Sequence, residues 1–180
     1  SEPGGEPLYA RARAIGDVVL VSVEMLTMPE SLVAAVKVRT GEKKLMLVAT
    51  HTHCAPDSQM LNDRMTIQIP GIASFRRRWL EWYADRVSEA IKQARTNQVR
   101  RVASFDIRQV SLPYARGRRP LAAPDNLATQ VDVQFEDGQS ETLFRVFAAH
   151  PTLLSARELK LRGDWPGQLM THEGGLAFTG

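Results

Sequence analysis

The sequence contains one cysteine, Cys54, four histidines and few aromatic residues. A single cysteine excludes an intramolecular disulfide, so a hydrophobic core has to hold the chain together. No segment approaches the ~18 consecutive apolar residues of a membrane span, and residues 1–7 are neither cationic nor apolar enough for a signal peptide. We therefore expect at most peripheral contact with a membrane.

A strong excess of one charge is also missing. The chain has 23 basic and 20 acidic residues, a net charge of +3 over 180 residues, and its basic side chains are scattered apart from Arg76–Arg78 and Arg116–Arg119. Nucleic-acid binding needs basic residues concentrated on one face, so we expect no nucleic-acid partner. With 43% hydrophobic and 24% charged residues, the composition is that of one globular domain, and residues 1–180 are interpreted as a single α/β module.

Hydrophobic periodicity predicts the secondary structure. The expected elements are a hairpin over 9–23, a helix from Pro29-Glu30-Ser31 to Gly41, a strand Leu45–Ala49 covered on both faces, a helix Ser74–Thr96, a strand Val99–Val110, a hairpin of Val131–Phe135 and Thr142–Ala149 around Asp137-Gly138, a short helix from Gln168 and a buried strand from Leu176. This order predicts the α/β fold class, with a mixed β-sheet flanked by helices.

Three of the four histidines, His51, His53 and His150, lie at predicted strand ends. Ligands of open α/β sheets bind at the carboxyl ends of strands, and imidazole is the commonest nitrogen ligand of zinc. His51 and His53 would face one pocket if their strand continued, because residues i and i+2 of a strand point to the same side. The pattern favours a metal site at these strand ends, although polar residues at a strand–loop junction would look the same.

Three further residues have two interpretations each. Asp164 either caps its own turn or orients a metal-bound histidine. His172, followed by Glu173, is interpreted as a solvated pair that could alternatively serve acid–base chemistry. Cys54 is interpreted as a small buried side chain rather than a ligand.

Several ordered segments together resemble the neutral, non-lysosomal ceramidase family, in particular its bacterial members. They are Leu8-Tyr9-Ala10-Arg11-Ala12, the strand Val18–Val23 followed by Met25, Thr50-His51-Thr52-His53 with Pro56, Phe147-Ala148-Ala149-His150-Pro151-Thr152, and Gly163-Asp164 with Gly167. The resemblance runs from about residue 8 to the end of the chain.

This resemblance implies a zinc-dependent hydrolase that cleaves an N-acyl amide, with a small-molecule or lipid amide as substrate. It implies that His51 and His150 bind zinc, and that His53 lies beside the metal and assists the developing oxyanion. Asp164 is the second candidate catalytic residue. The resemblance also suggests a secreted or periplasmic location, while the sequence leaves the oligomeric state open.

The sequence departs from the family pattern at three places. Cys54-Ala55-Pro56-Asp57 replaces the family's Ser-Gly-Pro-Gly, and Met170 stands where the family has a serine. The family's downstream Glu and Tyr ligands are missing, so we interpret the chain as an incomplete part of a larger catalytic domain. Two alternatives remain open, a noncatalytic binding or structural domain with a degenerate metal site, and a metallohydrolase that acts on esters or phosphoesters.

Overall fold

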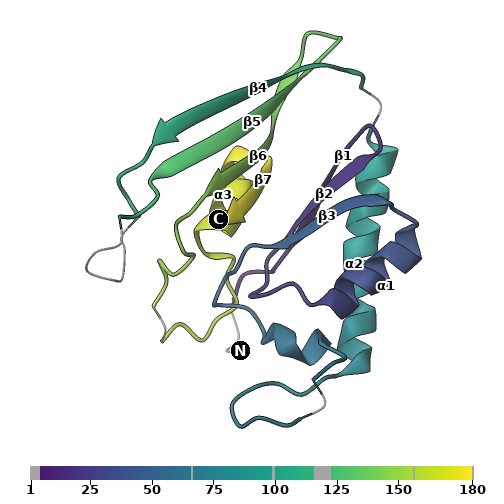
Figure 1. Ribbon diagram of the computed structural model, residues 1–180, viewed down its shortest axis with the longest axis vertical. Helices are drawn as coiled ribbons and strands as arrows, with labels where there is room; N and C mark the ends of the chain where they lie inside the picture. The colour runs from purple at the N-terminus through teal and green to yellow at the C-terminus, as the bar shows by residue number, and fades with distance from the viewer. Residues whose placement is uncertain (1–4, 66, 99, 116–122, 156, 180) are drawn as a thin grey trace.

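The described residues of the protein form two β-sheets and three α-helices (Figure 1). The computed structural model describes residues 5–65, 67–98, 100–115, 123–155 and 157–179. The first sheet has the order β1-β2-β3 and the second sheet the order β4-β5-β6-β7. The strands are β1 (Ala10–Ile15), β2 (Val18–Val23), β3 (Lys44–Ala49), β4 (Val102–Ser111), β5 (Leu127–Phe135), β6 (Ser140–Phe147) and β7 (Leu176–Thr179). The helices are α1 (Glu30–Thr40), α2 (Arg77–Thr96) and α3 (Asp164–Glu173), with a 3₁₀ turn η1 at Ser58–Leu61.

The first sheet begins with the predicted hairpin. β1 and β2 pair antiparallel, and β3 returns parallel to β2 after the crossover helix α1. As predicted, α1 begins after Pro29 and ends at Gly41, whose φ of 69° places it in the left-handed conformation that glycine adopts readily. The expectation that β3 is covered on both faces is confirmed only in part. Leu47 packs against the core under the helices and Val48 against the core between the sheets, but β3 is an edge strand and Met46 is 46% exposed. The central strand β2 is the buried one.

Helices α1 and α2 cover the outer face of the first sheet (Figure 1). The predicted long helix is present as α2, although it begins at Arg77 rather than Ser74. Its apolar stripe enters the core formed by β1, β2 and α1; the buried members of the stripe are Leu80, Ala84, Val87 and Ile91. No helix among the described residues combines the length and the apolar character that a bilayer span requires.

The second sheet contains the predicted hairpin of β5 and β6, which turns at Gly138 with a φ of 79°. β4 pairs antiparallel with β5, and the predicted buried strand β7 pairs parallel with β6. β4 begins at Val102; Val99 and the basic segment 116–119 lie outside the described residues. A second core lies between the two sheets and joins Leu20 of β2 to Val133 of β5 and Leu176 of β7.

Helix α3 begins at Asp164, so the expected start at Gln168 is wrong. Pro166 and Gly167 look like turn residues in the sequence, but proline is tolerated in the first helical turn, where its missing N–H has no intrahelical partner to lose. The amide of Gly167 donates to the carbonyl of Gly163 and closes that first turn. The helix therefore starts directly after Gly163.

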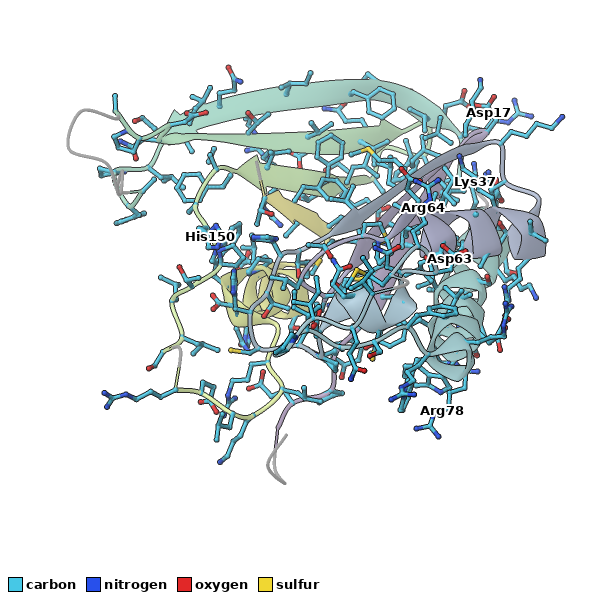
Figure 2. The ribbon with its side chains drawn as sticks, turned by 60° about the horizontal axis from the view of Figure 1, so that its bottom comes forward. Asp17, Lys37, Asp63, Arg64, Arg78 and His150 are labelled. Carbon is cyan, nitrogen blue, oxygen red and sulfur yellow. The ribbon has the colours of Figure 1, made fainter. Side chains whose placement is uncertain are left out.

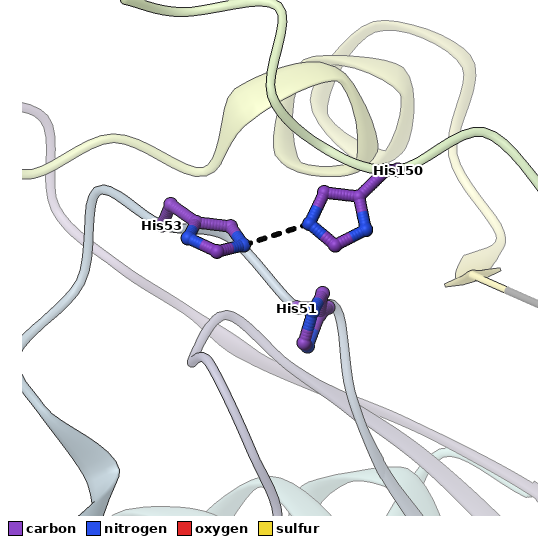
Figure 3. Close-up of side chains that lie close together, drawn as sticks. All are labelled: His51, His53 and His150. Carbon is purple, nitrogen blue, oxygen red and sulfur yellow. Dashed lines mark hydrogen bonds between the residues drawn. The ribbon is translucent and has the colours of Figure 1, made fainter. Parts of the chain in front are cut away.

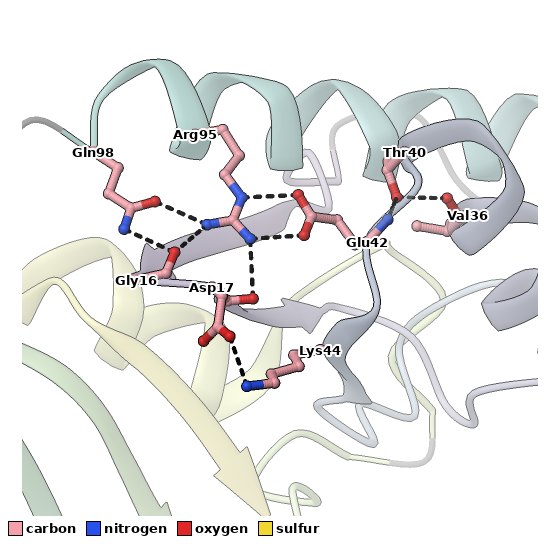
Figure 4. A network of polar contacts seen from close by, with 8 residues as sticks. All are labelled: Gly16, Asp17, Val36, Thr40, Glu42, Lys44, Arg95 and Gln98. Atoms are coloured by element: carbon pink, nitrogen blue, oxygen red, sulfur yellow. Dashed lines mark hydrogen bonds and ion pairs between the residues drawn. The ribbon is translucent and has the colours of Figure 1, made fainter.

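Arg95, near the end of α2, joins three elements of the first sheet's layer (Figure 4). Its guanidinium donates two hydrogen bonds to the carboxylate of Glu42, at 2.8 and 2.7 Å, and others to the carbonyls of Gly16 and Asp17. Asp17 in turn pairs with Lys44 at 2.6 Å. This network fixes the end of α2 to the β1–β2 turn and to the segment that enters β3.

Candidate metal centre

Three histidine side chains from two distant parts of the chain converge (Figure 3). His51 and His53 follow β3 and His150 follows β6, and one nitrogen from each ring lies within 4.8 Å of the others. The Nε2 atoms of His53 and His150 are 2.8 Å apart, and the ring centroids are 4.7 to 5.2 Å apart. These three residues are called the three-histidine cluster below.

The backbone turns His51 out of the line of β3. After Ala49 the amide of Thr50 donates to the carbonyl of Val23 at 2.8 Å, and the amide of His51 donates to that of Met25 at 2.9 Å. His51 has a φ of 65°, which is unfavourable for a residue with a β-carbon. His51 and His53 therefore meet through a left-handed kink rather than through the strand continuation that the sequence suggested.

One hydrogen bond selects the tautomer of the neutral His51 ring. Its Nδ1 lies 2.7 Å from the carbonyl oxygen of Leu26, which can only accept, so Nδ1 carries the proton and donates. The lone pair then resides on Nε2. A histidine that donates from Nδ1 to a backbone carbonyl is oriented to use Nε2 as a ligand.

The segment carrying His53 is anchored by its neighbours. The hydroxyl of the fully buried Thr52 donates to the carbonyl of Arg162 at 2.8 Å, and the amide of Arg162 donates to the carbonyl of Cys54. Cys54 is buried, as the sequence suggested, and burial raises the pKa of its thiol, with the carboxylate of Asp164 adding to the effect. A neutral, buried thiol is a packing group rather than a nucleophile.

His150 is positioned by Trp165, a residue that the sequence analysis did not single out. The indole Nε1 of Trp165 donates to the carbonyl of Ala149 at 3.2 Å, and its ring packs edge-on against Phe147. Figure 2 shows His150 on the segment that leaves the second sheet, well apart from Arg78 of α2. The only sequence signal for Trp165 is its place beside Asp164 in a Gly-Asp-Trp-Pro-Gly segment.

Asp164 is buried and bonded to backbone amides. Its Oδ1 accepts from the amide of Trp165 at 2.6 Å, and its Oδ2 accepts from the amide of Leu154 at 3.2 Å. It lines a cavity of about 1330 Å³ between the second sheet and α3, together with the exposed pair His172 and Glu173. The structure thus places Asp164 at the start of α3, where it holds the segment that follows His150.

Glu24 is a second residue that the sequence analysis missed. It directly follows the apolar strand β2 and is 3% exposed, paired with Arg11 and accepting from the amide of Tyr9. Burial raises the pKa of this carboxyl in spite of the Arg11 pair, which acts in the opposite direction. A β-carbon on Gly163 would lie 2.8 Å from its Oε2, so the glycine lets α3 approach the buried carboxylate.

A cavity of about 480 Å³ opens beside two of the histidines. His51, His150, Pro151 and Thr179 line it together with apolar side chains from β3 and from the segment after β2. Its lining mixes apolar side chains with the two imidazoles and the hydroxyls of Thr27 and Thr179. Met170 is buried and lines a different cavity beside β1.

The donor set of the cluster fits a divalent zinc ion. Imidazole nitrogens are common zinc ligands, and a catalytic zinc site keeps one position open for water or substrate. Zinc–nitrogen bonds of ~2.1 Å at tetrahedral angles require nitrogen atoms about 3.4 Å apart. The ligand atoms of the three residues lie within 4.8 Å of one another, so modest shifts of the rings bring two of them to this separation.

Comparison with solved structures shows that the fold is similar to that of ceramidases. The fold is similar to neutral ceramidase from Pseudomonas aeruginosa, with a TM-score of 0.72 and 17% identity over 90% of this chain. It is also similar to a structure described as ceramidase complexed with C2, with a TM-score of 0.69 and 17% identity. The chain spans 30% and 29% of those two chains. No protein-family profile and no curated protein sequence matches it.

These similarities establish a ceramidase-like α/β fold, as the sequence motifs suggested. Both sheets mix parallel with antiparallel pairing and are accompanied by helices, which confirms the predicted fold class. The roles of individual histidines and of Asp164 remain predictions.

Proposed function

We propose that this chain carries the metal-binding part of a zinc-dependent hydrolase that cleaves an N-acyl amide. The convergence of three imidazole nitrogens on a ceramidase-like fold is the observation that supports this function. In the proposal, His51 and His150 bind zinc through Nε2, and His53 lies beside the metal. The ceramidase-like fold favours a lipid amide or a related small amide as substrate.

Zinc in this site would lower the pKa of bound water toward ~7 and polarise the acyl carbonyl. The protein's own contribution is orientation. The Leu26 carbonyl holds the His51 ring, and Trp165 holds the backbone next to His150. His53 is exposed, and from its place beside the other two rings it can donate a hydrogen bond to an oxygen on which negative charge develops.

Asp164 acts as a positioning residue in this proposal. Its carboxylate bonds to the amides of Leu154 and Trp165, so it connects the segment after His150 to the start of α3. The cavity beside His51 and His150 contains apolar side chains such as Leu47 and Val48, which offer contacts for the acyl part of an amide substrate.

Metal content and turnover of the 180-residue chain test the proposal. We expect about one equivalent of zinc by elemental analysis, lost in His51→Ala and in His150→Ala and retained in the control His172→Ala, which removes a histidine outside the cluster. In His53→Ala we expect zinc to be retained and amide hydrolysis to fall by about 10²-fold or more. Zinc binding and hydrolysis that both survive His51→Ala would contradict the proposal.

A noncatalytic metal-binding domain is the second candidate, and the buried Met170 favours it. Methionine offers no hydroxyl at the position where the ceramidase pattern has a serine. A panel of N-acyl amides, esters and phosphoesters separates the candidates. Stoichiometric zinc without turnover of any substrate supports the binding domain, and turnover of phosphoesters alone supports a different metallohydrolase.

A further inference from the structure

The long strand β4 is an unpaired edge within the described part of the chain. β5 pairs with one side of it, and every residue of β4 after Val102 is exposed. Its apolar members are open to solvent, with Phe105 52%, Ile107 65% and Val110 55% exposed. A long, exposed edge with apolar side chains is a template for another β-strand.

The pairing with β5 determines which backbone groups of β4 are available. The amide of Leu112 donates to the carbonyl of Asn126, so Leu112 forms a hydrogen-bonded pair across the ladder. Bonded and non-bonded pairs alternate in an antiparallel ladder, so the amides and carbonyls of Val110, Arg108 and Asp106 also point toward β5. Those of Phe105, Ile107 and Gln109 point outward, toward a partner strand.

One register makes this edge complementary to itself. If two copies of β4 pair antiparallel about Ile107, Ile107 faces its counterpart and Phe105 faces Gln109, all of them residues with outward backbone groups. Asp106 then faces Arg108 of the second copy, twice by symmetry, at the non-hydrogen-bonded positions where side chains approach most closely. In a register centred on Phe105 or on Gln109, Asp106 and Arg108 would each face an uncharged residue of the second copy.

The same register covers the exposed apolar side chains. Phe105 and Ile107 lie opposite Val133 and Val131 of β5, whose side chains belong to the core between the sheets. The side chains of cross-strand partners point to the same face of a sheet. Phe105 and Ile107 therefore continue the core-facing side of β5 onto the edge strand β4. A second copy would bring its own Phe105 and Ile107 to that face.

We propose that β4 is a homodimer interface, in which the second sheets of two copies join antiparallel about Ile107 into one continuous sheet. The interface is isologous, so each contact occurs twice and the assembly closes at two copies. The proposal does not depend on the hydrolase function.

Cysteine cross-linking tests the register. In Ile107→Cys, two cysteines on the symmetry axis have Cα atoms about 5.5 Å apart, within the span of a disulfide. We expect a covalent dimer on nonreducing gels under mild oxidation. The matched control Phe105→Cys faces Gln109 of the second copy and should stay monomeric on the same gel. Cys54 is buried and should give no background. A cross-link in Phe105→Cys but not in Ile107→Cys would overturn the register.

Sedimentation equilibrium tests the interface itself. The unmodified chain should show a concentration-dependent dimer, and Asp106→Arg, which places like charges opposite each other twice, should weaken dimerisation by at least about tenfold. Glu89→Arg, on α2, makes the same change of charge away from the edge and should leave dimerisation unchanged. Circular dichroism confirms that each variant is folded. A chain that remains monomeric up to its solubility limit would overturn the proposal.

Discussion

His51 and Asp164 share an unusual backbone. They are the only residues other than glycine with a positive φ in the described part of the chain, at 65° and 54°. Such conformations reduce the free energy of unfolding by about 1–3 kcal/mol each, and they persist only where the surrounding contacts hold the backbone in place. Both residues were candidate site residues from sequence alone, so the unfavourable backbone coincides with the proposed site.

The backbone of His51 predicts an unusual order of variant stabilities. Glycine adopts a φ of 65° without the steric penalty of a β-carbon, so we expect His51→Gly to be about 1 kcal/mol more stable than His51→Ala. His53 has no positive φ and provides the control, because there the alanine variant should be the more stable one. Urea unfolding of the four variants measures the order. Equal stability of the two His51 variants would contradict the prediction.

Gly163 predicts a second effect at the residue scale. A β-carbon there would lie 2.8 Å from both the Glu24 carboxylate and the backbone of Gly167, so Gly163→Ala should lower the free energy of unfolding by about 1–3 kcal/mol. The nearest atom to a β-carbon on Gly167 is 3.1 Å away, and Gly167→Ala should cost less. Thermal or chemical unfolding measures both, and the reverse order would contradict the close approach.

Whether a site residue could be recognised from the sequence depended on its residue type. The three histidines were recognisable because imidazoles are few and stand at strand ends. Glu24 and Trp165 were missed because their importance comes from contacts with distant residues. Glu24 matters through its approach to Gly163, and Trp165 through its bond to Ala149, and neither contact leaves a local pattern.

At the scale of elements, the end of α2 is held by a charged pair. Hydrogen bonds from Arg95 hold the pKa of Glu42 below its ordinary value of 4.5, and both side chains are partly buried. A carboxylate with a lowered folded-state pKa contributes stability that is fully present above the unfolded-state pKa. That contribution disappears as the pH falls through the lowered value.

Glu42→Gln should therefore show a pH-dependent loss of stability. We expect the variant to be less stable than the unmodified chain by about 1–2 kcal/mol at pH 7, with the difference unchanged down to about pH 5. Below pH 4.5 the difference should shrink as Glu42 becomes protonated. Denaturant unfolding across this range measures it. A difference that stays constant into strong acid would show that the charge of Glu42 is not its source.

The elements themselves were predictable where the hydrophobic periodicity agreed with residues that mark the end of a helix or a turn. α1, α2 and the β5–β6 hairpin have both signals. The coverage of β3 was predicted only in part, because a short apolar run does not reveal that the strand lies at an edge. α3 was misplaced because Pro166 and Gly167 suggest a turn, although both are tolerated in a first helical turn.

At the scale of the whole molecule, the two sheets are joined through β2. Leu20 lies in the core between the sheets, and the buried hydroxyl of Ser22 donates to the carbonyl of Ala177 of β7 at 2.8 Å. A single sequence does not state which strands pair over long distances. The α/β class was therefore predictable, whereas the division into two packed sheets was not.

Leu20→Ala should consequently weaken the whole fold. Removing a buried leucine side chain costs about 2–4 kcal/mol, and here the lost contacts are those between the sheets. Met46→Ala, on the neighbouring strand but 46% exposed, should cost less than about 1 kcal/mol. Calorimetry of both variants measures the difference. Similar losses in the two variants would argue against a shared core between the sheets.

The 97-residue separation between His53 and His150 also has a thermodynamic consequence. An ion held in the three-histidine cluster would bind the folded chain and not the unfolded one, so its binding energy would add to the stability of the fold as a whole. At a free zinc concentration one hundred times the dissociation constant, this linkage adds about 2.7 kcal/mol. The melting temperature would then report metal occupancy, and a chelator would act on this protein as a mild denaturant.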